Sequence, residues 1–400
     1  MVRHVYVHVP FCASICPFCA FDVRVNRDTE IDRYLERLDT EAAGVADRLE
    51  VVPDTVYLGG GTPSQLDDRQ LERLVGILSD RFAWAPGDPA VEATIELHPD
   101  DVRSHGVTLG RARRLVGLGF NRLSVGVQST DDAILARLGR THDASAALAA
   151  VEDCVAAVAA AAAAGRAGTA AGGTVSADLM VAVAGQDWER DLTTVAATGV
   201  DHVSTYSLTV EPGTPFARRG VRVDEEDELR ALDAATEVLG AAGIDRYEVS
   251  NHARPGSECR HNRAYWSNSC WVGLGPSAGG HEPALATPGF HDAPDGSRPA
   301  LTDRVANARG TAWFDGAAPE RSPCDSDTWW ADAVACGLRM VEGVDLDGLA
   351  ERAGSAMPPL LADGVERLTG RGWLAADGPR ISATAAGTRV LDRVMAEIWA

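Results

Sequence analysis

The chain contains no lysine, and all 37 of its basic residues are arginine. This absence excludes a lysine Schiff base, a lysine nucleophile and the lysine of a phosphate-binding P-loop. Positive charge is also scarce, because 58 acidic residues against 37 basic ones give a net charge of −21. A protein that binds a nucleic-acid backbone needs a positive face, so this composition argues against nucleic acid as a partner.

Long hydrophobic runs are almost missing as well. One Ala/Gly-rich tract near 155–165 is the exception, and alanine is too weakly hydrophobic for us to expect that tract to insert into a membrane. Residues 1–10 have no basic region followed by an apolar core, so they do not resemble a signal peptide. We therefore expect a cytoplasmic protein without a transmembrane segment.

What is present is the composition of a globular protein, with 45% apolar and 24% charged residues. A length of 400 residues suggests two or three domains. Strands are predicted at 2–9, 55–58, 91–97, 122–127, 174–181 and 202–208. Helices are predicted between and after them at 31–49, 71–82, 108–117, 143–164, 188–198 and 225–241. Such α/β alternation requires a parallel sheet with helical crossovers, either a barrel or a doubly wound sheet.

The placement of chemically distinctive residues favours the barrel. Each lies within a successive predicted strand, at its end or just after it. In chain order they are the loop of Cys12, Cys16 and Cys19, the glycine run 59–61, Glu96, Gln128, Asp178 and Tyr206. Barrel sites collect at that carboxyl-terminal face, whereas an open sheet gathers its ligands at one switch point. We predict a partial TIM-type (β/α)6 barrel.

The second half of the chain is less regular. A connecting region rich in Pro, Gly and Asp is predicted over 282–327, and a separate small unit over 325–400. The helix–hairpin–helix order of this unit, ending in a helix over 384–399, predicts a winged-helix-like module. Its arginines are matched by acidic residues, so we expect packing or docking and no nucleic-acid binding. Residues 165–173 are expected to form a surface loop.

The three clustered cysteines follow the spacing Cys-x3-Cys-x2-Cys, directly after the first predicted strand. Thiolates at this spacing bind a soft metal or an iron–sulfur cluster. A zinc site would add a fourth Cys or His nearby, but position 21 is Phe. Three thiolates on a four-iron cluster leave one iron open to exchange a ligand.

This spacing is that of radical SAM proteins, whose open iron is ligated by S-adenosylmethionine (SAM). The segments 6–12 (YVHVPFC), 58–64 (LGGGTPS) and 121–128 (NRLSVGVQ) resemble the oxygen-independent coproporphyrinogen III oxidase family more specifically. The resemblance runs from about residue 3 to the C-terminus. It implies a radical SAM core barrel over 1–245, a heme-binding segment and linker over 246–324, and a winged-helix-like domain over 325–400.

That family has two branches: oxidases of porphyrin biosynthesis, which decarboxylate their substrate, and radical SAM heme chaperones. The oxidases carry a further cysteine where the chaperones and this chain have Phe, here Phe21. The segments 247–251 (YEVSN) and 261–266 (HNRAYW) resemble the chaperone branch, whose heme-binding motif is His-Asn-x-x-Tyr-Trp. The resemblance thus implies a chaperone that binds heme, a 4Fe-4S cluster and SAM and transfers heme to an acceptor protein.

The resemblance also implies roles for single residues. Cys12, Cys16 and Cys19 would hold the cluster, and His261 would ligate the heme iron. Tyr265 and Trp266 would cover a porphyrin face. The SAM pocket would consist of Tyr6, Phe18, Gly60, Gly61, Thr62, Glu96, Gln128, Arg140 and Asp178.

Within that pocket, Glu96 would pair with the SAM ammonium and Arg140 with its carboxylate. Gln128 and Asp178 would bind the ribose hydroxyls, and the small residues at 60–62 would let the backbone approach SAM closely. Tyr6 and Phe18 would pack near the methionine and adenine groups.

Alternatives stay open at this point. The chain could be the oxidase itself, or a radical SAM enzyme for another substrate in which His261 is structural. Zinc at His261 with Cys259 and Cys270 does not follow a usual spacing. Covalent heme attachment is open too, although the Cys-x-x-Cys-His signature is absent. The acceptor is unknown; the resemblance implies contact with membrane-bound respiratory proteins, although the acidic surface disfavours direct binding to anionic lipid.

Three departures from the family pattern bear on the pockets. Residues 182–186 (AVAGQ) stand where the family usually has Gly-Leu-Pro-Gly-Gln, and His98 stands where the chaperones often have Asn. Residues 277–280 (SAGG) replace a segment that commonly contains His. We expect the local shape of the SAM and heme pockets to differ as a result, but not the cluster site.

Overall fold

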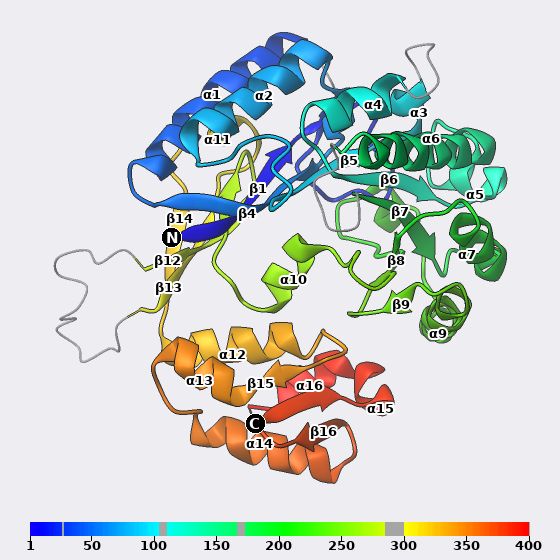
Figure 1. Cartoon of the computed structure of the whole chain (residues 1–400). Helices are drawn as coiled ribbons and strands as arrows, with labels where there is room; N and C mark the ends of the chain where they lie inside the picture. Colours follow the sequence, from blue (N-terminus) through cyan, green and yellow to red (C-terminus); the bar gives the residue numbers. More distant parts are fainter. Residues whose placement is uncertain (26–27, 104–109, 166–172, 285–299, 400) are drawn as a thin grey trace.

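The computed structural model describes residues 1–25, 28–103, 110–165, 173–284 and 300–399 (Figure 1). Its centre is a sheet of six parallel strands that stand side by side in chain order: β1 (Val2–Val9), β4 (Val51–Gly60), β5 (Glu92–Leu97), β6 (Arg122–Gln128), β7 (Thr174–Val181) and β8 (His202–Ser207). A doubly wound sheet reverses its strand order at a switch point, and this one does not. The predicted α/β fold with a partial (β/α)6 barrel is therefore confirmed.

Three short strands extend the sheet beyond these six. β11 (Val272–Leu274) pairs in parallel with β1. At the other side, β10 (Asn251–Ala253) pairs antiparallel with β8, and β9 (Asp245–Arg246) pairs antiparallel with β10. Among the described residues, β11 and β9 form the two edges and do not pair with each other. The barrel is therefore partial.

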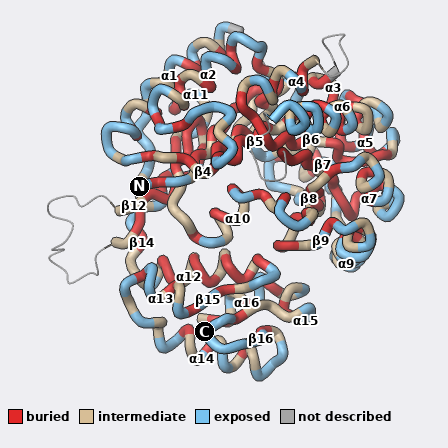
Figure 2. Tube along the Cα trace, viewed as in Figure 1, coloured by how far each residue is buried: buried red, intermediate tan, exposed pale blue. Residues whose placement is uncertain are grey.

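Helices connect the strands and cover the outer face of the sheet, with their buried sides turned inward (Figure 2). They are α1 (Asp28–Ala46), α2 (Asp68–Arg81), α3 (Pro99–Arg103), α4 (Gly110–Gly117), α5 (Asp132–Arg137), α6 (Ala144–Ala163), α7 (Trp188–Ala196) and α9 (Glu225–Ala241). The apolar pattern predicted that α2 starts three residues later. It starts earlier because the Asp67 side chain caps it and accepts the Gln70 N–H at 2.7 Å.

Side chains alternate along the strands, which separates an apolar layer from a polar interior. Val5, Val7 and Val9 of β1 are fully buried in the main core with the helices. His4 and Tyr6 lie on the opposite face, where His4 contacts Thr55 of β4 and Tyr6 contacts Tyr57. The barrel interior is thus lined by polar and aromatic residues.

Helix α6 contains the Ala-rich tract. In the described part of the chain it is the one helix with the length and composition of a membrane span, with a mean hydropathy of 1.8 over the tested window. A third of that window, 33%, is buried inside the fold. Ala150, Val151 and Cys154 belong to the main core, so packing accounts for much of its apolar character. Residues 166–172 of the predicted loop lie outside the described residues.

The region 282–327, predicted as a connecting segment, has more structure than its composition indicates. It contributes most of a three-stranded sheet and a helix: β12 (Gly279–Pro283), β13 (Thr302–Ala306), β14 (Glu320–Cys324) and α11 (Gly310–Phe314). Trp313 of α11 is buried against Tyr34 of α1, with ring centroids 5.6 Å apart. This apolar anchor fixes the segment to the barrel.

The remaining chain forms a unit with its own apolar core, built around Trp330, Leu361 and Val394. Its elements are α12 (Ser326–Gly337), β15 (Val344–Asp345), α13 (Leu346–Ala353), α14 (Pro359–Gly370), β16 (Leu374–Asp377), β17 (Arg380–Ala383), α15 (Ala385–Thr388) and α16 (Leu391–Glu397). The order agrees with the predicted winged-helix-like fold. The prediction of one continuous helix over 384–399 was wrong, because this segment forms two helices, α15 and α16, separated at Arg389 and Val390.

Candidate functional site

The cysteine loop follows β1 at the carboxyl end of the barrel. Cys12 belongs to β2 (Phe11–Cys12), which pairs with β3 (Arg24–Val25), and the Cys19 N–H donates to the Cys16 carbonyl at 3.1 Å. All three cysteines are free and partly exposed. The sequence-predicted triad therefore sits on one ordered loop that solvent reaches.

The three thiols form one electrostatic group. The pKa of Cys12 is raised to about 11, mainly by burial; the Thr62 hydroxyl, 3.4 Å from Cys12 Sγ, opposes the rise, and the Cys19 and Cys16 thiols contribute to it. The Arg140 guanidinium donates to Cys16 Sγ at 3.4 Å. Neighbouring thiols that disfavour each other's ionisation are a donor set that a cluster of iron cations would stabilise. The residues present fit the 4Fe-4S cluster.

The glycines after β4 form the wall beside this loop. Gly60 has a φ of +99°, and a Cβ there would lie 2.2 Å from His8 Nδ1. A Cβ on Gly61 would lie 2.6 Å from the Val9 carbonyl oxygen. Both positions therefore require glycine, because any side chain there would collide with His8 or with the backbone of the cysteine loop.

The predicted SAM residues of the middle strands all lie in the barrel interior. Glu96 of β5 accepts the Tyr57 hydroxyl at 2.8 Å and the Gly60 N–H at 3.1 Å. Burial, with Asp178 of β7 nearby, raises the pKa of Glu96 to about 7. Asp178 in turn accepts the Ser124 hydroxyl at 3.2 Å. The structure thus brings together two carboxyl groups from β5 and β7, the strands on either side of β6.

Gln128 ends β6 in a left-handed conformation, with a φ of +70°. Its side-chain oxygen accepts the Tyr206 hydroxyl at 2.6 Å, and the β6–β7 register shifts just before it. A non-glycine residue held at positive φ costs about 1 kcal/mol or more. The strand end is strained where the sequence predicted a ligand-binding side chain.

The remaining predicted SAM residues line the same end. Arg140 donates to the Gly126 carbonyl at 3.2 Å, and its Nε is buried without a hydrogen-bond partner. The Phe18 ring contacts Phe216, with centroids 6.2 Å apart. Tyr6 lies deeper, bonded to His8 at 3.1 Å, with its ring 6.5 Å from that of His261. An arginine whose Nε has no partner, two neighbouring carboxyl groups and a run of glycines fit a zwitterionic nucleoside such as SAM.

His261 lies at the opposite, amino end of the barrel. It belongs to α10 (Arg260–Trp266), and its Nδ1 bonds the Thr55 hydroxyl at 2.7 Å. The residue is 1% exposed, and burial lowers the pKa of its imidazole to about 3. Its Nε2 is buried without a hydrogen-bond partner. The side chain is therefore a neutral imidazole whose Nε2 has no hydrogen-bond partner.

Glu92 holds α10 at the amino end of the barrel. Its carboxylate accepts the Arg260 N–H at 2.9 Å and the His261 N–H at 3.0 Å. The helix lies between the barrel and the C-terminal unit (Figure 1), where Arg352 of α13 donates to the carbonyls of Ser267 at 2.7 Å and Asn268 at 2.8 Å. The loop after α10 is thereby clamped from the C-terminal side.

These observations test heme binding in two ways. A neutral imidazole nitrogen without a partner fits an axial ligand to heme iron. The same nitrogen faces a packed cluster in which the Tyr265 ring lies 4.7 Å from the His261 ring. Tyr265 and Trp266 are both partly buried beside it. The donor fits heme, and a porphyrin reaches it only when α10 separates from its neighbours.

The sequence interpretation missed the interior residues that hold the predicted ones in place. Tyr57 and Ser124 belong to this group, as does Glu92. A signal was present in the first strand, where His4, Tyr6 and His8 alternate with valine. Period-two alternation of polar and apolar residues marks a strand whose second face is not part of the apolar core.

One departure from the family pattern has a visible consequence. Ala182 stands at the first glycine position of the usual Gly-Leu-Pro-Gly-Gln segment and has a φ of +59°. Ser277, at the segment expected to contain His, also has a φ of +59°. The chain keeps left-handed turns at both places without glycine, at a cost in backbone strain.

Comparisons with known proteins agree with this arrangement. The model of the radical SAM superfamily matches residues 6–160, and that of the HemN C-terminal domain matches residues 325–390. The solved structure of coproporphyrinogen III oxidase (HemN) from Escherichia coli covers 99% of this chain and 90% of its own, with a TM-score of 0.76 and 20% identity. That likeness concerns the fold.

Relatives in sequence are more specific. Heme chaperone HemW of Mycobacterium tuberculosis (strain ATCC 25618 / H37Rv) is 36% identical over 289 residues, which cover 69% of each chain. The HemW proteins of Escherichia coli (strain K12) and Bacillus subtilis (strain 168) are 32% and 30% identical over 69% and 70% of this chain and 69% and 71% of their own. Together with the cysteine loop and the barrel, these matches show that the chain belongs to the HemW family of radical SAM proteins.

Proposed function

We propose that this protein is a heme chaperone: it binds heme, a 4Fe-4S cluster and SAM, and transfers heme to an acceptor protein. The observation that carries the proposal is the match to relatives named heme chaperone at 30–36% identity. We further propose that it works in the cytoplasm and that its acceptor is a protein of respiration. The domain boundaries at residues 245 and 324 belong to the same proposal.

The carboxyl end of the barrel would hold the cluster and SAM. Cys12, Cys16 and Cys19 would ligate the cluster, which supplies an open iron for SAM. Arg140 contributes a cation beside the thiolates, and its unpartnered Nε leaves a donor for the SAM carboxylate. Glu96, held by Tyr57, offers a carboxyl group for the ammonium.

The amino end would hold heme. His261 presents the unpartnered nitrogen, and Thr55 orients its ring by bonding the other nitrogen. The neighbouring rings of Tyr57 and Tyr265 lie 5.2 Å and 4.7 Å from the imidazole and exclude water around it. These contacts keep the imidazole neutral, as an iron ligand must be.

Hemin titration of the purified protein tests the heme site. We expect a shifted Soret band with wild type and its loss, or at least tenfold weaker binding, with His261→Ala. His252→Ala is the matched control, because His252 is equally buried and both its ring nitrogens lack partners. Identical spectra for wild type and His261→Ala would overturn the assignment.

A turnover assay separates the chaperone from the oxidase. The cysteine that the oxidases carry is replaced by Phe21, whose side chain is 69% exposed. A phenyl ring can neither ligate a metal nor transfer a proton, so we expect no protoporphyrinogen from coproporphyrinogen III under anaerobic reduction with SAM. Formation of that product would favour the oxidase instead.

A further inference from the structure

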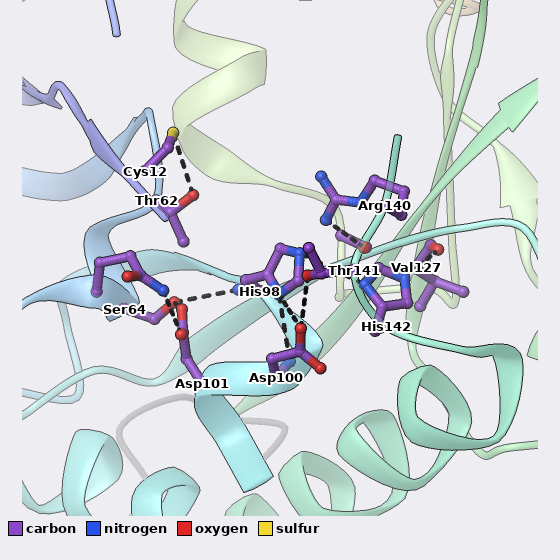
Figure 3. Close-up of polar contacts among 12 residues, drawn as sticks. Cys12, Thr62, Ser64, His98, Asp100, Asp101, Val127, Arg140, Thr141 and His142 are labelled. Carbon is purple, nitrogen blue, oxygen red and sulfur yellow. Dashed lines mark hydrogen bonds and ion pairs between the residues drawn. The ribbon is translucent and has the colours of Figure 1, made fainter. Parts of the chain in front are cut away.

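We propose that His98, Asp100 and His142 form a binding site for one divalent transition-metal ion, separate from the cysteine triad. His98 follows β5, Asp100 lies in α3, and His142 lies between α5 and α6. Figure 3 shows the side chains of His98, Asp100 and His142 beside one another, with Arg140 above them and Cys12 at the upper left of the view. One ligand atom from each residue lies within 4.8 Å of the other two.

The spacing of the donor atoms fits such an ion. His98 Nε2 and His142 Nδ1 are 3.4 Å apart. His98 Nδ1 accepts the Asp100 N–H at 3.2 Å, so Nε2 is the ring nitrogen that would bind the ion, and it releases its proton when the ion binds. Two nitrogens bound to a tetrahedral zinc ion at 2.0–2.1 Å are separated by about 3.3 Å. The two imidazoles therefore need little movement to share one ion.

Neighbouring groups orient the donors. His142 Nε2 bonds the Val127 carbonyl at 3.2 Å, and because a carbonyl only accepts, that nitrogen carries the proton. The lone pair of His142 is thus on Nδ1, which faces His98. Thr141 donates to Asp100 Oδ2 at 2.7 Å and steadies the carboxylate. Bonds of this kind to the outer atoms of ligands are usual around protein metal sites.

Charge and access are compatible with a cation. Burial lowers the pKa of His98 to about 3 and lowers that of His142, so both rings are neutral, as ligands must be. Arg140 opposes a cation here, while Asp100 and Asp143 favour one. The side chains of His98 and Asp100 are 15% and 44% exposed, so an ion has a path from solvent.

The donor set also separates this site from the cluster. Two imidazoles and a carboxylate suit zinc or a similar divalent ion, whereas the thiolates suit iron–sulfur chemistry.

Zinc binding to the cluster-loaded protein tests the proposal. We expect about one zinc per chain retained after dialysis against a weak chelator, and at least tenfold weaker binding in His98→Asn and in Asp100→Asn. Asp315→Asn, which removes an exposed carboxylate from a surface ion pair, is the control and should bind like wild type. Thermal unfolding verifies that each variant is folded.

X-ray absorption at the zinc edge then identifies the ligands. We expect a nitrogen and oxygen shell with imidazole scattering and no sulfur shell. Zinc binding unchanged by both variants, or a sulfur shell, would overturn the site. A chain with Cys12, Cys16 and Cys19 replaced by serine should still bind zinc, so the result is independent of whether the cluster and heme proposals hold.

Discussion

The two ends of the barrel interior differ in how they are built. At the carboxyl end, Cys12, Cys16 and Cys19 sit on a partly exposed loop, and cationic Arg140 lies beside them. At the amino end, His261 of α10 is almost fully buried and neutral, and the C-terminal unit bonds the loop that follows this helix. One strand set therefore supports an open end with charged groups and a closed end with neutral imidazoles.

This difference indicates which end of the barrel would have to change its structure for a ligand to bind or leave. At the carboxyl end the three cysteines are partly exposed to solvent. A porphyrin needs α10 to leave contacts that include two backbone bonds to Glu92 and two to Arg352. Heme entry and release should therefore be slow steps that depend on the C-terminal unit, while the cluster end works independently.

The largest expected effect concerns that independence. Cys16→Ser should abolish iron and sulfide incorporation after anaerobic reconstitution, while hemin binding stays within twofold of wild type. His261→Ala should do the reverse. Cys336→Ser, a half-buried cysteine of the C-terminal unit, is the control for both measurements. A joint loss of iron and heme in either variant would mean that the two ends are coupled.

Glu92→Gln tests how the closed end is held. The amide keeps one acceptor but turns an N–H group toward the start of α10, and it leaves the buried Arg122 guanidinium without its nearby carboxylate. We expect a loss of about 3 kcal/mol in the free energy of unfolding by denaturant. Exposed Glu320→Gln should change it by less than about 0.5 kcal/mol; equal effects would contradict the capping role.

The neutral imidazoles predict a pH dependence at the closed end. Burial lowers the pKa of His252 to about 4 from 6.5, so its contribution is complete above pH 6.5 and is lost as pH falls through 4. Stability should decline over this range by an amount on the order of 3 kcal/mol. His252→Leu should flatten the slope measured by denaturant unfolding at several pH values, and an unchanged slope would refute the assignment.

Arg352→Ala should loosen the clamp on the loop after α10. It removes two bonds to backbone carbonyls and the cation–π contact with Trp329 at 5.2 Å, so we expect a loss of about 1–2 kcal/mol. Hydrogen exchange in α10 and heme association should both become faster. Arg230→Ala, an exposed arginine of α9, should leave both rates unchanged; slower heme association in Arg352→Ala would argue against gating by this unit.

Ala182→Gly should give the smallest effect, a gain of about 0.5–1 kcal/mol from relief of the positive φ. This gain would support the interpretation that the turns at the carboxyl end of the barrel keep a strained backbone. Ala184→Gly, in the same turn but without a positive φ, should be neutral or destabilising. Equal shifts in melting temperature for the two variants would contradict the strain argument.

Much of the fold and of the open end could be predicted from the sequence. The strand and helix alternation gave the barrel, because parallel strands need helical crossovers. The cysteine spacing and the glycine run mark the open end through local chemistry. Residues 282–327 could not be predicted in the same way: Trp313, which anchors them, packs on a helix more than 260 residues away in the chain.

The sequence by itself determined the parallel barrel, the cysteine triad at its carboxyl end and the absence of a basic surface on the C-terminal unit, since each follows from periodicity, local spacing or charge. Only the tertiary structure decided that His261 is buried at the other end, that Glu92 and Arg352 hold its helix and loop, and that His98 faces His142. These relations join residues far apart in the chain, and burial and lone-pair direction exist only once the strands are in register.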